Sequence, residues 1–75
     1  KRYALKYVAN EGFVANIKNC NVSNCKYTVE LGSDLYPGNK YTVNFENNQL
    51  ASGVADYKVA HEEGATINGG TAYTE

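Results

Sequence analysis

The sequence predicts a small all-β protein, an antiparallel two-sheet sandwich or partly closed barrel of five to six short strands. Three observations indicate this class. Apolar and polar residues alternate with a period of two, turn signals separate the alternating segments, and strand-favouring tyrosine, valine and threonine dominate the clearest of them. With 75 residues the chain can bury one core, so we expect residues 1–75 to form a single β-domain.

The first two predicted strands are residues 3–9 and 13–18, separated by a turn at 10–12. In the second segment Phe13, Ala15 and Ile17 fall on one face of the strand, and Val14, Asn16 and Lys18 fall on the other. The first segment alternates in the same way.

The third and fourth predicted strands, residues 26–31 and 40–45, are nearly the same string and are the clearest in the chain. Residues 36–39, Tyr-Pro-Gly-Asn, have the composition of a type II turn between them. A solenoid requires at least three repeats and only two are apparent. We therefore interpret the two strings as two good strands, not as an internal duplication.

Residues 53–60 predict a fifth strand and residues 65–67 a short sixth, while residues 71–75 either pair as an edge or fray. Helix-tolerant residues precede the fifth strand, but Gly53 disfavours a helix there by about 1 kcal/mol relative to alanine. A single open sheet would leave one apolar face unburied, which favours two packed sheets or a barrel.

Cys20 and Cys25 flank four residues, and we expect them to form a structural disulfide on a hairpin tip. Closing so short a loop would contribute roughly 2 kcal/mol by the chain-entropy estimate. Two free thiols are the alternative, and the spacing is wrong for a C-x-x-C redox pair. Two sulfurs alone do not complete a zinc site, so no metal is expected.

The cysteine loop also contains Asn21-Val22-Ser23, a triplet that accepts N-glycosylation in a eukaryotic secretory route. The disulfide and this triplet together favour a secreted, extracellular protein. The chain does not begin with methionine, so we expect a mature form or fragment from which a leader could have been removed.

Charge and hydropathy argue against two classes of partner. The net charge is −1, with 7 basic and 8 acidic residues spread along the chain, so no basic footprint for nucleic acid is present. The apolar runs are far shorter than the roughly 20 residues that span a bilayer. We expect neither a nucleic-acid partner nor a membrane span.

No residue pattern indicates catalysis or a cofactor. The single histidine, His61, lies in a glutamate-rich turn and is expected to be exposed, and no phosphate-binding, dinucleotide-binding or metalloprotease motif is present. The sequence therefore predicts a protein that is not an enzyme and has no cofactor.

The sequence predicts function by binding a target protein, as an effector, toxin-like virulence factor or inhibitor, through an edge strand or surface residues. Tyr36, Asn39 and Tyr73 lie outside clear strand alternation and are the candidate contact residues. The alternative is a carbohydrate-facing or structural module of a larger cell-surface or adhesin protein, in which exposed tyrosine and asparagine side chains would contact sugars.

Overall fold

The structure, a computed structural model, describes residues 2–7, 10–32 and 34–74, and these form eight short strands joined by turns, with no helix among them. Every pair of neighbouring strands is parallel. The strands are β1 (Tyr3–Tyr7), β2 (Phe13–Lys18), β3 (Asn21–Val22), β4 (Tyr27–Leu31), β5 (Tyr41–Glu46), β6 (Gln49–Leu50), β7 (Ala55–Val59) and β8 (Ala65–Asn68). Positions 8 and 9 of the first predicted strand, and position 75 of the predicted terminal edge, lie outside the described residues.

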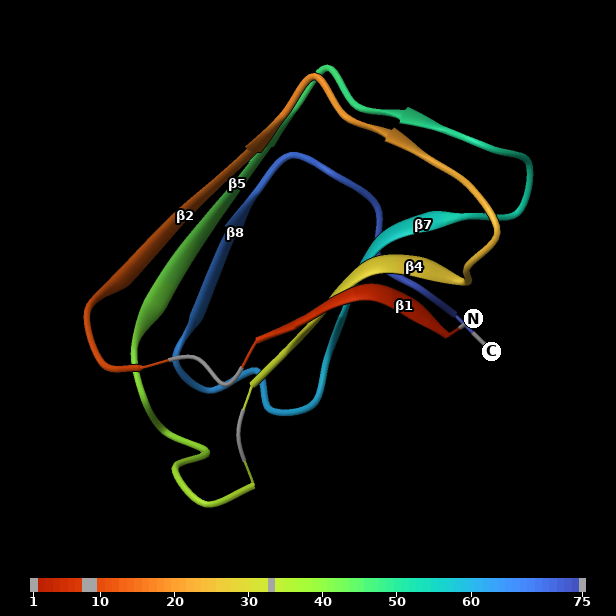
Figure 1. The fold of residues 1–75 in the computed structure, drawn as a ribbon. Helices are drawn as coiled ribbons and strands as arrows, with labels where there is room; N and C mark the ends of the chain where they lie inside the picture. Colours follow the sequence, from red (N-terminus) through yellow and green to blue (C-terminus); the bar gives the residue numbers. More distant parts are fainter. Residues whose placement is uncertain (1, 8–9, 33, 75) are drawn as a thin grey trace.

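The chain winds as a β-solenoid. It adds one strand to each of three sheets in turn and then returns to the first, so that successive coils stack on one another (Figure 1). The first sheet has the order β1-β4-β7, the second β2-β5-β8 and the third β3-β6. The three sheets are the sides of the coil, and the core lies inside it.

The predicted antiparallel sandwich or barrel is therefore wrong, although the all-strand content is right. Alternation with a period of two shows that one face of a strand is buried, but it is the same for parallel and antiparallel neighbours. Whether two neighbouring strands are parallel or antiparallel depends on how the chain connects them. The turns between consecutive strands are corners at which the chain passes from one sheet to the next.

The coils differ in length because one connection contains an insertion. In the first sheet Tyr3 pairs with Tyr27 and Tyr27 pairs with Ala55, so the second step along the chain is longer than the first by four positions. In the second sheet the longer step comes first, from Phe13 to Tyr41, and the shorter one follows, from Tyr41 to Ala65. Both longer steps include the connection between β4 and β5, so the extra residues lie within positions 32–40.

This insertion explains why the repeat of the solenoid was not recognised in the sequence. The two similar strings, residues 26–31 and 40–45, form β4 and β5, which lie in different sheets of the same coil. They are not stacked on one another. The strands that do stack, such as β2, β5 and β8, are separated by unequal steps, and the solenoid that the sequence analysis set aside is the fold that forms.

The core consists of inward side chains of the middle coil, with the first and third coils packed against it. Val29, Leu31, Tyr41, Val43 and Phe45 are buried. Phe13, Ala15 and Ile17 pack against them from the first coil, in agreement with the predicted alternation of that segment. From the third coil, the Tyr57 ring stacks on Phe45 with a centroid separation of 5.4 Å.

The third coil is shortened and closes over the core. After β8, Gly69 and Gly70 adopt positive φ of 71° and 79° and return the chain directly to the first sheet, where Ala72 bridges to Tyr57. A Cβ on Gly70 would lie 2.9 Å from a ring carbon of Phe45, so glycine permits this close approach. The C-terminal end of the solenoid is thus partly covered by the chain itself.

Candidate functional site

The predicted disulfide is wrong, because Cys20 and Cys25 are free. Cys20 is exposed and Cys25 is half-buried, and the strand β3 lies between them. A disulfide requires the two Cα atoms within about 7 Å, which a hairpin tip provides, whereas β3 holds this segment extended as a side of the coil. The secreted, toxin and virulence interpretation loses the support that it drew from this bridge.

The predicted modification and contact residues lie on different parts of the surface. Asn21, the glycosylation candidate, is exposed on β3 and pairs in register with Gln49. Tyr36 is 62% exposed in the inserted loop, and the backbone N–H of Asn39 donates to its carbonyl oxygen at 3.2 Å. The structure brings Tyr36 and Asn39 together in one loop, but not with Asn21.

Tyr73, the third contact candidate, is half-buried in a small tyrosine cluster. Its ring lies 5.0 Å from that of Tyr27, which in turn lies 6.2 Å from Tyr3. Tyr27 is fully buried, and its hydroxyl donates to Glu30 Oε1 at 3.2 Å. Tyr73 therefore covers Tyr27 at the start of the first sheet.

His61 is half-buried, and its Nε2 lies 2.7 Å from Asp34 Oδ1. This contact joins the inserted loop to the turn between β7 and β8. Among the described residues, no group of three or more histidine, cysteine or acidic side chains is arranged to hold a metal ion. The pair is thus a link between two loops of adjacent coils.

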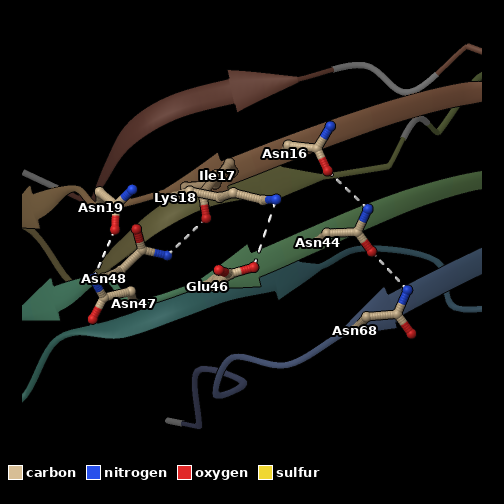
Figure 2. Close-up of polar contacts among 9 residues, drawn as sticks. All are labelled: Asn16, Ile17, Lys18, Asn19, Asn44, Glu46, Asn47, Asn48 and Asn68. Carbon is tan, nitrogen blue, oxygen red and sulfur yellow. Dashed lines mark hydrogen bonds and ion pairs between the residues drawn. The ribbon is translucent and has the colours of Figure 1, made fainter.

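The most regular polar feature is an amide ladder on the outer face of the second sheet, formed by Asn16, Asn44 and Asn68 (Figure 2). Asn68 Nδ2 donates to Asn44 Oδ1 at 2.7 Å, and Asn44 Nδ2 donates to Asn16 Oδ1 at 2.9 Å. The three residues are in register on β8, β5 and β2. Stacked identical amides can bond in this way only where parallel strands are closely aligned.

A second pair of stacked asparagines marks the corner after β2 and β5. Asn19 and Asn47 share a left-handed φ of 56°, and Asn47 Nδ2 donates to Asn19 Oδ1 at 2.7 Å (Figure 2). Beside them, Asn48 donates to the Ile17 carbonyl at 3.0 Å and accepts from the Cys20 N–H at 3.0 Å. The Asn48 side chain thereby satisfies backbone groups of the first coil where regular pairing is interrupted.

Both amide contacts of the ladder have the same direction, so its two ends differ chemically. Each carboxamide donates toward the N-terminal coil, which leaves Asn16 Nδ2 as a donor without an acceptor among the described residues. At the other end, Asn68 Oδ1 points away from the ladder (Figure 2). The N-terminal end of the solenoid thus presents an amide donor and the opposite end an amide acceptor.

The N-terminal end, formed by β1, β2 and β3, also contains an apolar recess. Its volume is about 200 Å³, and its lining is almost wholly apolar. The first coil contributes the rim and the second coil the floor. Leu5 is 55% exposed, whereas its register partner in the next coil, Val29, is 3% exposed. This end presents core-type side chains to solvent. The lining residues are Leu5, Lys6, Phe13, Ala15, Ile17, Val29, Leu31 and Val43.

We take this end of the solenoid, with the free edge of β2 and the apolar recess, as the candidate functional site. Lys18, on the same edge, pairs with Glu46 at 3.6 Å, so the outer face of β2 presents an asparagine and a lysine two residues apart. Among the recess residues Lys6 is a titratable group, and its Nζ lies 3.8 Å from Glu30 Oε2.

Comparison with known proteins finds no matching family model, curated protein or solved structure. No helix that could span a membrane occurs in the described part of the chain.

Sequence reasoning missed the amide ladder and the recess. The signal for the ladder was present, because an asparagine directly follows an inward residue in Val14-Ala15-Asn16, Thr42-Val43-Asn44 and Thr66-Ile67-Asn68. The unequal steps between these three segments concealed the repeat. The recess had no comparable signal, because its lining comes from strands of two coils that are brought together only by stacking.

Proposed function

We propose that the chain is a non-catalytic binding module that holds a partner protein at the apolar recess beside β1 and β2. The observation that carries this proposal is the combination of this recess of core-type side chains with an edge of β2 that no other described strand pairs. Edge strands with an apolar face are templates for pairing with another chain. A partner strand would bury both the recess and the edge.

The rest of the outer surface supports binding at this end. On the second sheet the amides of the ladder are engaged with one another. Charged side chains of β1, β2, β4 and β5 form ion pairs across neighbouring strands, as in Lys6–Glu30 and Lys18–Glu46. Such mutually satisfied columns stabilise the coil and offer few unfilled contacts to a ligand.

The test is a selection of displayed peptides against the full chain. We expect extended peptides that bind saturably and lose binding in Ala15→Lys, because that change places a charge in the recess next to the β2 edge. The matched control is Thr66→Lys, which adds the same charge on the exposed face of β8. A selection that yields no saturable ligand, or ligands indifferent to Ala15→Lys, would contradict the proposal.

A carbohydrate-facing module is the second candidate, and one observation favours it. A groove of about 350 Å³ crosses all three coils at the start of the second sheet, where Val14, Thr42 and Thr66 lie in register beside Lys40 and Glu63. Saturable binding on a glycan array, lost in Thr42→Ala, would favour this function over the first.

A further inference from the structure

We infer that Asn68 is a site of spontaneous deamidation, and that its conversion to aspartate reverses the direction of the amide ladder. This modification concerns the outer face of the second sheet and is independent of binding at the recess. Asn68 is exposed at the end of β8, and the residue that follows it is Gly69. It is the one asparagine of the sequence that precedes a glycine.

Deamidation uses atoms of these two adjacent residues only. The backbone nitrogen of Gly69 gives up its proton and attacks the side-chain carbon Cγ of Asn68. The bond from Cγ to Nδ2 breaks, ammonia leaves, and a five-membered succinimide ring remains. Water then opens the ring at Cγ to give aspartate, or at the main-chain carbonyl carbon to give isoaspartate. The net reaction consumes one water molecule and releases one ammonia molecule.

The fold itself requires this reactive pair of residues. An asparagine is needed at position 68 because Asn68 Nδ2 donates to Asn44 Oδ1 at 2.7 Å. A glycine is needed at position 69 because φ is 71° and a Cβ there would lie 2.6 Å from the Phe45 carbonyl oxygen. The missing side chain also removes the steric hindrance that slows ring closure before larger residues. A requirement of the fold thus produces a labile bond.

The other two asparagines of the ladder lack this combination. Asn16 is followed by Ile17 and Asn44 by Phe45, and both asparagines have paired strand residues before and after them. Such pairing holds the main chain extended, whereas ring closure requires rotation that brings the next backbone nitrogen toward Cγ. At Asn68 the strand pairing with β5 ends, so the main chain is less restrained there. We therefore expect deamidation at Asn68 and not at its two stacked counterparts.

An aspartate at position 68 changes the direction in which the ladder can bond. A carboxylate accepts but cannot donate, so it cannot replace the bond from Asn68 Nδ2 to Asn44 Oδ1. When the Asn44 carboxamide turns over, its Nδ2 donates to the carboxylate in a charge-assisted hydrogen bond. Its Oδ1 then faces Asn16, whose Nδ2 is not used in the present ladder and becomes the donor. Both bonds of the ladder are kept, in the opposite direction.

The first measurement follows deamidation of the folded chain. The protein is incubated in mildly alkaline buffer, which favours loss of the Gly69 N–H proton, and is then digested and mapped by mass spectrometry. We expect aspartate and isoaspartate at position 68, with Asn16 and Asn44 intact. Uptake of one ¹⁸O atom from labelled water would identify the succinimide route.

Asn68→Gln is the matched control for this measurement. It keeps a carboxamide, but closure of a six-membered ring is much slower, so conversion at this position should be lost. Circular dichroism would verify that the variant is folded. Absence of conversion in the folded parent chain, or equal conversion at Asn16 or Asn44, would overturn the inference.

The second measurement uses Asn68→Asp, which makes the aspartate product by substitution. In ¹³C,¹⁵N-labelled protein, scalar coupling across a hydrogen bond connects the donor nitrogen to the carbon that carries the acceptor oxygen. We expect Asn44 Nδ2 to couple to Cγ of Asn16 in the parent chain and to Cγ of position 68 in the variant. Asn16→Asp is the matched control, because it places the carboxylate where the oxygen already accepts and should leave the present direction unchanged.

Urea denaturation gives a separate readout of the reversal. Asn68→Ala removes one bond of the ladder, whereas Asn68→Asp keeps two if the ladder reverses. The unfolding midpoint of Asn68→Asp should therefore lie above that of Asn68→Ala. An unreversed ladder would set the carboxylate against Asn44 Oδ1 and place the midpoint below that of Asn68→Ala. That order of midpoints, or coupling of Asn44 Nδ2 to Asn16 in the Asn68→Asp variant, would overturn the inference.

Discussion

Asp56 and Thr71 are joined by reciprocal hydrogen bonds at the point where the third coil returns to the first sheet. The carboxylate oxygen Oδ2 of Asp56, a residue only 6% exposed, accepts from the Thr71 backbone N–H at 2.8 Å and from its hydroxyl at 3.2 Å. The backbone N–H of Asp56 in turn donates to the Thr71 carbonyl at 2.9 Å. This contact fastens the segment that covers the C-terminal end of the solenoid.

Replacing Asp56 by alanine should lower the free energy of unfolding by about 1–3 kcal/mol, because the Thr71 backbone N–H and hydroxyl both lose the carboxylate oxygen that accepts from them. Urea denaturation would measure the change. Thr71→Val removes the hydroxyl and keeps the backbone bond, so it should cost less, roughly 0.5–1.5 kcal/mol. Equal stability of Asp56→Ala and the parent chain would show that this contact does not hold the C-terminal segment.

Gly70→Ala should destabilise the fold more than Gly53→Ala, although the two glycines have similar φ of 79° and 81°. At Gly53 nothing lies within 4 Å of an added Cβ, so only the backbone conformation resists the change, at about 1 kcal/mol. At Gly70 the added methyl meets the Phe45 ring as well, and the total should reach roughly 2–3 kcal/mol. Thermal unfolding of the two variants side by side would test this difference.

Asn44→Ala should cost about 1–2 kcal/mol of stability, because Asn44 is the one described residue that bonds both neighbours in the amide ladder. Asn68→Ala, at the end of the ladder, removes a single bond and should cost about half as much. Chemical denaturation of the two single variants and the double variant would also show coupling. Both substitutions remove the same Asn68–Asn44 hydrogen bond, so the double variant should lose less stability than the two single variants together.

Stability should fall above pH 10, and Tyr41→Phe should weaken that fall. Burial raises the pKa of the Tyr41 hydroxyl above its ordinary value of 10.0. The unfolded chain therefore loses this proton at a lower pH than the folded chain, so its contribution to stability is complete below pH 10 and is lost as the pH rises through the folded-state pKa.

At neutral pH the same variant should be as stable as the parent or slightly more so, because the described residues offer the buried Tyr41 hydroxyl no hydrogen-bond partner. Urea denaturation at pH 7 and at several values above pH 9 would separate the two effects. A parallel decline in both proteins would assign the alkaline loss to other groups, first among them Tyr27, whose pKa is raised by burial and then by the negative charge of Glu30.

Both thiols should react with a small thiol reagent in the folded protein, Cys20 faster than Cys25, since Cys20 is exposed and Cys25 half-buried. Reductant should change neither the intact mass nor the unfolding midpoint. A mass two hydrogens lower in the absence of reductant would instead show a bridge and contradict the free cysteines of the structure.

The sequence predicted the strands well because the burial of one face is a local property. The alternation in residues 13–18 and 40–45 corresponds to inward side chains at Phe13, Ala15, Val43 and Phe45. Strand direction is not local, since it depends on whether the chain turns back or passes round a corner. Asn19 and Asn47 mark such corners through their left-handed φ, but the same residue type is equally suited to hairpin turns.

The candidate site was only partly accessible from sequence. An edge strand was expected as the contact, but which strand would be an edge depended on the stacking order. Tyr36 and Tyr73 were both chosen because they lie outside clear strand alternation. Tyr36 is exposed, whereas Tyr73 packs on Tyr27. The disulfide failed for the same reason as the sandwich: both assumed that the chain turns back on itself between Cys20 and Cys25.

The insertion between β4 and β5 lengthens the connection between these strands without changing how either strand pairs with the neighbouring coils. Both strands keep their register with the coils above and below, although the connection between them is longer than its counterparts. The loop is fastened near its ends by the Asp34–His61 contact and by the close approach of Gly64 to the Asn39 carbonyl, while nothing lies within 4 Å of a Cβ on Gly38. Strand pairing, and not the length of this connection, therefore sets how the coils stack, so a connection of a different length between Leu31 and Tyr41 is compatible with the same register.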